Sequence, residues 1–524
     1  MTEVEAILLL LAVTTLLVAV ARRIDVPYPI LLVVGGLGIG LVPWIPNIEL
    51  EPEHVFVLIL PPILQSAAFF TPVRDFRTHL RSILSLAVLL VLVSTAAVAA
   101  VAHLVVDGLS WPAAFVLGAI VSPPDAVSAT AVAERLGLPR RVVSILEGES
   151  LVNDATALVA LRVATAAAVT GHFSLGEALW DFVRSAAIGI VVGFALGWLV
   201  NELLVRIRDN AILIATTLLA PYASYLAAEH LHASGVLAVV VSGLLMGRVF
   251  FRLPEPSSRL QSVGFWRMYL FLLNGFVFIL IGAQLPEVLD RIEGVDRWTL
   301  AGYAAAVCGT AIAVRMGWVF LTSDPALSFR RATSCFEAPA RADRRELAVI
   351  GWAGMRGVIS LAAALALEPD VPGRDLILFL TFAVILVTLV FQGLTLAPLI
   401  RWLGVAADGE EAREDLEART AMAIAARARL EELSSEPWAF DEIVADLASH
   451  LDHRVDRLGA RIDIDRDETE TEKLAAVGRK LQAALLQAEL DEAVRLRDAG
   501  GISDATLRGL QRNLDVERLR LERV

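Results

Sequence analysis

The sequence is poor in cysteine, lysine and charge. Cys308 and Cys335 are the only cysteines in 524 residues, which excludes a disulfide framework. Charged residues make up 20% of the chain, less than the roughly 25% of an average soluble domain, whereas hydrophobic residues make up 56%. The chain also lacks Cys/His clusters with zinc spacing and the G-x-S-x-G, P-loop and H-E-x-x-H motifs, so the sequence indicates neither an enzyme nor a resident cofactor.

The net charge of −13 is unevenly distributed along the chain. Residues 1–403 have a net charge of −3, and residues 404–524 have a net charge of −10. Nothing in this balance favours nucleic-acid binding. We therefore expect a membrane domain over 1–403 and a charged cytoplasmic helical domain over 404–524, in which Leu416, Ala423 and Leu430 recur at helical spacing.

Long apolar runs dominate the first domain. The runs have 17 to 28 residues each, enough to cross a bilayer as a helix. The pattern predicts an all-α polytopic membrane protein with thirteen transmembrane helices near 4–20, 28–46, 53–70, 82–106, 111–133, 142–169, 182–205, 211–229, 234–250, 265–285, 298–321, 346–367 and 375–402.

Arginines between these segments predict the orientation. The loops after segments 1, 3, 5, 7, 9 and 11 contain 18 arginines, whereas the alternate loops contain three. Positively charged loops favour the cytoplasmic side of the membrane. We therefore expect a protein of a bacterial plasma membrane with its N-terminus outside the cell and its C-terminus in the cytoplasm.

Two segments carry helix-breaking residues at matching positions. Segment 5 contains Pro123 and Pro124, and segment 12 contains Gly351, Gly354 and Gly357. Because segments 1–6 and 8–13 have opposite expected orientations, the pattern predicts inverted repeats with two interrupted helices. Transporters of this kind bind their substrate at the crossing of such helices.

Ionisable residues in membrane helices are energetically costly and mark ion or proton pathways. Here they concentrate around the expected breaks and in segment 6, as Asp125, Glu147, Glu149, Asp154 and Arg356, with Arg315 in segment 11. The uncharged polar residues Ser150 and Asn153 accompany them in segment 6. On a helix Ser150 and Asp154 share one face, and no cationic side chain lies one turn from Asp154. Such an oxygen cluster suits a monovalent cation, and a buried carboxyl group can exchange that cation for a proton.

The other charged residues have supporting roles in this interpretation. We expect Glu149 to pair with Arg356, which would connect segment 6 to interrupted segment 12. Glu147 is expected at the cytoplasmic mouth, and Arg315 is an accessory candidate. Arg162, two turns beyond Asp154, fits either a pore-side or a packing role.

Four motifs follow one another along the chain: S-P-P-D-A-V-S-A-T-A-V, E-G-E-S-L-V-N-D-A-T-A-L-V, F-V-F-I-L-I-G-A-Q-L at 276–285 and G-M-R-G-V-I-S-L at 354–361. They resemble the motifs of sodium/proton exchangers of the monovalent cation:proton antiporter-1 family. The order and spacing match over roughly residues 5–403. One departure is Pro124-Asp125-Ala126, where many members have Thr-Asp-Pro.

The resemblance implies a 13-helix homodimeric antiporter in which a core domain moves against a dimerisation domain. Asp154 would carry the ion or the proton, with Asp125 and Ser150 completing the monovalent-cation site. Asn153 would occupy a position held by aspartate in electrogenic relatives, and Glu149–Arg356 would be the core ion pair. A role in pH homeostasis follows for such a protein.

Together these observations predict an electroneutral sodium/proton antiporter with alternating access. Lithium and potassium remain alternative substrates, and a potassium/proton antiporter is the nearest rival. A gated cation channel is the rival from another class. A channel would favour a continuous polar pore over one buried acid at crossed, broken helices.

Overall fold

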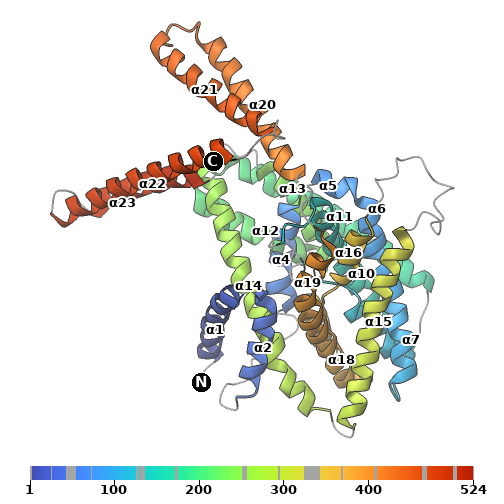
Figure 1. Cartoon of the computed structure of the whole chain (residues 1–524). Coiled ribbons are helices and arrows are strands. Elements are labelled where there is room, and N and C mark those ends of the chain that lie inside the picture. Colours follow the sequence, from blue (N-terminus) through green and yellow to red (C-terminus); the bar gives the residue numbers. More distant parts are fainter. Residues whose placement is uncertain are drawn as a thin grey trace. The chain divides into compact units, whose positions relative to one another are not determined.

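A computed structural model describes most of the chain. The described residues are 3–24, 26–42, 55–71, 73–125, 129, 136–171, 175–250, 256–292, 295–323, 343–367, 370–405, 410–462, 469–499 and 504–522. All regular secondary structure within them is helical (Figure 1). The chain divides into two compact units, Met1–Ala407 and Asp408–Val524.

Each of the thirteen apolar segments contains helix in its described part. Seven helical stretches are by themselves long and apolar enough to cross a membrane: Leu80–Val105, Arg140–Thr170, Trp180–Arg206, Asn210–His230, Ser258–Leu289, Arg297–Thr322 and Arg374–Leu403. Shorter apolar helices include Tyr28–Gly40, Val57–Phe70, Trp111–Val121 and Gly235–Phe250. The predicted parts of segments at 43–46, 53–54, 126–128 and 130–133 lie outside the described residues.

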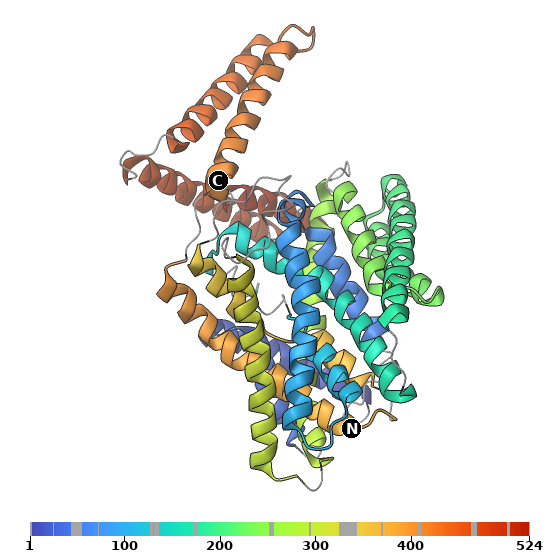
Figure 2. The same ribbon diagram turned by 90° about the vertical axis from the view of Figure 1, so that its right-hand side faces the viewer.

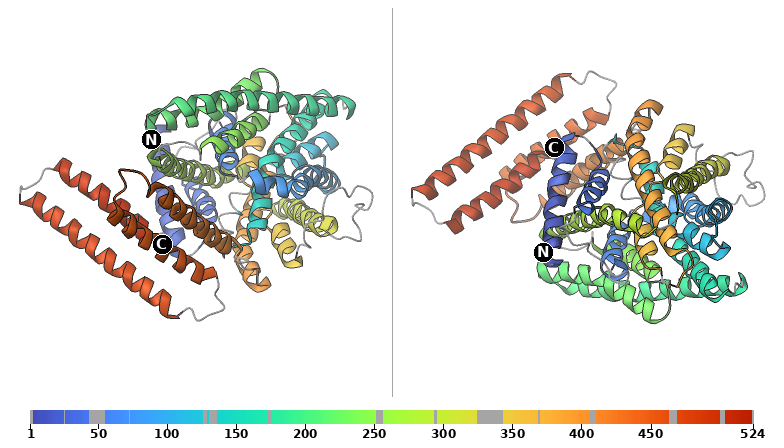
Figure 3. Two further views of the ribbon diagram at one scale, coloured as in Figure 1. Left: turned by 90° about the horizontal axis from the view of Figure 1, so that it is seen from above. Right: turned by 90° about the horizontal axis from the view of Figure 1, so that it is seen from below.

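We name one group of helices the α14 bundle, after its longest helix. Its members are α1 (Glu3–Ile24), α2 (Tyr28–Gly40), η1 (Val55–Ile59), α4 (Leu60–Phe70), α11 (Leu175–Arg206), α12 (Asn210–His230), α13 (Gly235–Phe250) and α14 (Pro256–Asp290). Within it, α14 packs most extensively on α2, and α13 packs on α11 and α4. In Figure 3, the green helices α11 to α13 lie along one edge of the first unit.

The remaining helices of the first unit form what we call the α10 bundle. They are α6 (Leu80–Leu84), η2 (Ser85–Leu90), α7 (Val91–Val105), α8 (Trp111–Val121), α10 (Arg140–Thr170), α15 (Arg297–Ser323), α16 (Arg344–Trp352), α17 (Val358–Leu365), α18 (Arg374–Val387), η4 (Thr388–Gln392) and α19 (Gly393–Leu403). Helix α8 packs between α7 and α10, and α15 packs on α7 and α16 (Figure 2). Short α5 (Val73–Thr78) leads from α4 into this bundle.

Glycines allow α2 and α14 to approach closely. A Cβ atom at Gly36 would lie 2.0 Å from the carbonyl oxygen of Ile279, and one at Gly282 would lie 2.0 Å from that of Val33. Close backbone approach through small residues is a common way to pack helices where no water drives association. This contact holds the centre of the α14 bundle together.

The two expected interruptions lie in the α10 bundle. Helix α8 ends at Val121, directly before Ser122 and the two prolines, because Pro123 and Pro124 have no N–H group with which to continue the helical hydrogen bonds. The helix predicted over 346–367 is split into α16 and α17, and residues 353–357 between them are not helical. The break predicted in segment 12 is thus confirmed, and α8 ends where the prolines of segment 5 predict.

The second unit consists of two helical hairpins. Helix α20 (Glu410–Leu433) packs on α21 (Asp441–Ile462), and α22 (Thr469–Asp498) packs on α23 (Asp504–Glu522). Ala423, one of the residues expected on an apolar helix face, is 2% exposed.

Candidate ion-binding site

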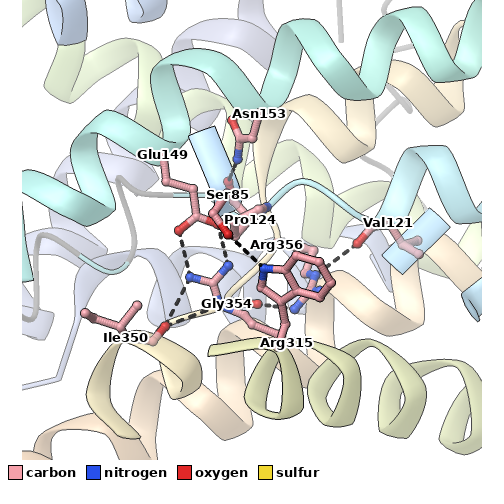
Figure 4. Close-up of polar contacts among 10 residues, drawn as sticks. Ser85, Val121, Pro124, Glu149, Asn153, Arg315, Ile350, Gly354 and Arg356 are labelled. Carbon is pink, nitrogen blue, oxygen red and sulfur yellow. Dashed lines mark hydrogen bonds and ion pairs between the residues drawn. The ribbon is translucent and has the colours of Figure 1, made fainter. Parts of the chain in front are cut away.

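The two interrupted helices meet through their backbones. The Asp125 N–H, which follows the prolines, donates to the Met355 carbonyl oxygen at 2.6 Å. A Cβ atom at position 357 would lie 2.3 Å from Asp125 Oδ2, so Gly357 allows this close approach. From α10, the Asn153 side-chain amide donates to the Pro124 carbonyl oxygen at 2.9 Å (Figure 4). Asn153 therefore fixes the interruption against the helix that carries Asp154.

Two buried arginines satisfy carbonyl groups at the broken helix ends. Arg356 donates from Nε to the Val121 carbonyl oxygen, at the end of α8, at 3.0 Å, and from Nη1 to the Gly354 carbonyl oxygen. Arg315 donates to the Ile350 carbonyl oxygen near the end of α16, at 3.1 Å from Nη2. The last carbonyl groups of a helix have no hydrogen-bond donor within the helix, and the membrane interior has no bulk water to supply one. The two arginines supply these donors.

Glu149 pairs with Arg315 in the same region. Arg315 Nη1 and Nη2 lie 2.5 Å and 2.9 Å from the two carboxylate oxygens of Glu149, and the side chains are 2% and 1% exposed. The predicted Glu149–Arg356 pair is therefore wrong. The guanidinium of Arg356 is occupied by backbone carbonyls, whereas Arg315 reaches Glu149 from α15 (Figure 4).

Asp154 lies one and a half turns further along α10 and differs from Glu149. Its side chain is 2% exposed, yet its Oδ2 atom has no hydrogen-bond partner among the described residues. None of the arginines described forms an ion pair with it. A buried carboxylate is very costly without compensation, so this group requires either a proton or a bound cation.

A cavity of about 300 Å³ brings the predicted site residues together. It is lined by Asp125, Glu147, Ser150 and Asp154 from the α10 bundle, and by residues of α4 and α14 from the other bundle. Asn153, Glu149, Arg315 and Arg356 are buried behind this wall. The lining acids and hydroxyl supply the hard oxygen ligands that suit alkali cations. Among the described residues no group of three His, Cys, Asp or Glu side chains is arranged for a resident metal.

A second cavity, of about 750 Å³, lies beside the other half of α10. On its wall Arg162 Nη2 contacts the two carboxylate oxygens of Glu229 at 2.8 Å and 3.1 Å. Arg162 belongs to the α10 bundle and Glu229 to α12 of the α14 bundle. The sequence left open whether Arg162 has a pore-side or a packing role. Arg162 lies on a cavity wall, and its ion pair with Glu229 connects the two bundles.

The sequence alone did not single out several polar residues on these walls, among them Glu229, Asn274 and Ser360. Glu229 and Asn274 are polar residues in or at the end of apolar segments, which is a usable signal. Ser360 lies within the G-M-R-G-V-I-S-L motif but resembles any helical serine in the sequence alone.

Known proteins with similar sequences are named as cation/proton exchangers. Residues 8–402 match the family described as "Sodium/hydrogen exchanger, transmembrane". An uncharacterised sodium/proton exchanger of Mycobacterium tuberculosis is 36% identical over 98% of this chain and 95% of its own length. A sodium, potassium, lithium and rubidium/proton antiporter of Bacillus pumilus is 34% identical over 75% of this chain and 60% of its own length.

The fold also matches a solved structure. The sodium proton antiporter MjNhaP1 of Methanocaldococcus jannaschii superposes with a TM-score of 0.62 at 21% identity. The match covers 76% of this chain and 98% of that protein. At this identity the likeness concerns the fold alone.

Proposed function

Because this chain belongs to the sodium/hydrogen exchanger family of membrane transporters, we propose that it exchanges one sodium ion for one proton across the plasma membrane. Asp154 is the group that carries either ion. The observation that carries the proposal is its Oδ2 atom, which is buried and lacks a partner among the described residues, on a side chain that lines the cavity at the helix crossing.

The remaining site residues act around this carboxyl group. Asp125 and Ser150 line the same cavity and supply further oxygen ligands. Asn153 positions the interrupted segment through its bond to Pro124, and Arg315 neutralises Glu149. Glu147, also on the cavity wall, lies toward the start of α10, where the proposed orientation places the cytoplasm.

Transport proceeds by movement of the α10 bundle against the α14 bundle. Both cavities lie between these bundles, one on each side of Asp154 along α10. In the proposed topology, thirteen transmembrane helices form two inverted repeats, the N-terminus is outside, and residues 404–524 form a cytoplasmic domain. The first cavity then connects Asp154 with the cytoplasmic side. The chain acts as a homodimer that contributes to pH homeostasis.

A single carboxyl carrier makes the cycle electroneutral. Each crossing moves Asp154 with one monovalent cation or one proton, so the charge moved is the same in both directions. A cycle that moved net charge would gain about 2.3 kcal/mol per charge per 100 mV. Sodium uptake into proteoliposomes with an imposed potassium–valinomycin potential and no pH gradient is therefore expected not to follow the sign of the potential. Uptake that follows the sign would require a second carrier.

Potassium is the second candidate substrate, because the Bacillus pumilus relative is named for sodium, potassium, lithium and rubidium. Proteoliposomes with a trapped pH indicator separate the possibilities. We expect proton efflux on addition of sodium, with lithium and potassium compared at equal concentration. Efflux with potassium alone would assign the potassium/proton exchange instead. No efflux with any of the three cations would contradict the proposed function.

A further inference from the structure

Two polar side chains on the wall of the first cavity have no assigned role. Asn274 of α14 is 7% exposed and Ser360 of α17 is 1% exposed. Asn274 Oδ1 and Ser360 Oγ have no hydrogen-bond partner among the described residues, and both residues line the cavity that contains Asp154. Buried polar groups are nearly always hydrogen-bonded, so two orphans beside a third on one cavity wall call for an explanation.

Ser360 differs from the buried helical serines whose hydroxyl groups are satisfied by the backbone. Ser66, on the same cavity wall, donates to the Ile63 carbonyl oxygen at 2.8 Å, and Ser122 and Ser242 also donate to a carbonyl three residues back. Such backbone bonding is the usual solution for serine in a helix. Ser360 makes no such bond, so its hydroxyl is available to a group in the cavity.

The chemistry of the two groups points to a cation. An amide carbonyl and a hydroxyl are neutral oxygen ligands, which replace water around a hard cation without adding charge. A proton on Asp154 needs no such shell. We propose that Asn274 and Ser360 form a neutral subsite that, together with Asp154, binds the partly dehydrated alkali cation. This inference rests on the proposed function and adds two ligands to its site.

The two ligands belong to different bundles, which gives them different roles. Ser360 and Asp154 both belong to the α10 bundle and remain together when the bundles move against each other. Asn274 belongs to the α14 bundle and contacts the cation only in the arrangement seen here. Asn274 therefore contributes to cation affinity from the membrane face served by the first cavity, whereas Ser360 contributes from both faces.

Side-specific transport kinetics test this assignment. Sodium-driven proton movement is measured in right-side-out and in inverted membrane vesicles for Asn274→Ala and Ser360→Ala. If one cation contact with about the net strength of a hydrogen bond is lost, the KM for sodium rises about three- to tenfold. We expect that increase for Asn274→Ala in one vesicle orientation only and for Ser360→Ala in both, with kcat at saturating sodium retained.

The chain provides matched controls. Asn201 of α11 also has a buried Oδ1 atom without a partner among the described residues, and Ser262 of α14 has such an Oγ atom, but neither lines either cavity. Asn201→Ala and Ser262→Ala are expected to leave the sodium KM unchanged. Asn274→Ser, which keeps an oxygen, should recover part of the lost affinity. Variant KM values equal to those of the controls would overturn the subsite, and an equal change on both faces for Asn274→Ala would overturn its side-specific role.

A binding measurement separates this proposal from the proposed function. The thermal unfolding midpoint of the purified protein is followed with increasing sodium, lithium or potassium, and with choline as a control. If wild-type vesicles show no exchange, the proposed function fails, whereas the subsite is still tested by this shift. We expect a cation-dependent rise that is reduced in Asn274→Ala and Ser360→Ala. No rise in the wild type, or the same rise in both variants, would contradict the subsite.

Discussion

The two buried carboxylates of α10 have opposite surroundings. Glu149 is held by two hydrogen bonds from Arg315, behind the cavity wall. Asp154, five residues further along, faces the cavity with an Oδ2 atom that has no partner among the described residues. Both are almost completely buried. Burial is therefore the same for both acids, and what separates Glu149 from the proposed carrier Asp154 is the permanent counter-charge of Arg315.

The largest effect is expected from removing the unpartnered acid. Asp154→Asn keeps the size of the side chain but removes the carboxyl group that we propose exchanges cation and proton. Exchange in proteoliposomes should fall to the background of empty vesicles. The thermal unfolding midpoint should be retained, because no ion pair is lost. Sodium-driven proton movement at the wild-type rate in this variant would eliminate Asp154 as the carrier.

Breaking the paired acid should affect stability first. Arg315→Ala leaves Glu149 buried without its counter-charge, at a cost of about 3–5 kcal/mol in the free energy of unfolding. Adding Glu149→Ala should recover part of this loss. A double-mutant cycle on thermal stability measures the coupling, which we expect to be larger for Glu149 with Arg315 than for Glu149 with Arg356. Strictly additive losses for Glu149 and Arg315 would contradict the observed pair.

The crossing between the interrupted helices gives a smaller effect. Gly357→Ala places a methyl group 2.3 Å from Asp125 Oδ2, so the interrupted segments must shift. Overpacking of this kind costs about 1–3 kcal/mol, and we expect lower stability together with slower exchange. Gly309→Ala on α15 is the matched control, because its methyl group would meet nothing within 4 Å. Equal behaviour of the two alanine variants would argue against a tight crossing.

The sequence predicted the helices and the place of the site better than it predicted the pairing. The apolar runs and the breaks at Pro123–Pro124 and at the glycines depend on local composition, so they can be predicted from the sequence alone. The Glu149 partner depends on how α15 packs beside α16, which no local pattern specifies. Arg356 does not pair with Glu149 because its guanidinium group donates to backbone carbonyls at the interrupted helices. These contacts depend on how α8 packs against the segment before α17, which the sequence alone does not specify.

The smallest effect is expected at the exposed ion pair between the bundles. The side chains of Arg162 and Glu229 are 55% and 31% exposed, and pairs of this kind contribute about 0.2–1 kcal/mol. Arg162→Ala should lower the thermal midpoint only slightly, and the difference should shrink further in high salt. Arg291→Ala, which removes an arginine that follows α14 and pairs with Glu287 of that helix, is the control. If Arg162→Ala lowered the thermal unfolding midpoint as much as Arg315→Ala, the small contribution expected from the exposure of this pair would be wrong.

The central claim is that one carboxyl group, Asp154, binds the cation and the proton in turn. Proton release from purified protein on addition of sodium, followed in weakly buffered detergent solution, tests it most directly. The account predicts close to one proton released per sodium bound, with no release from Asp154→Asn and normal release from the Gly309→Ala control. Sodium binding without proton release in the wild type, or undiminished release from Asp154→Asn, would contradict it.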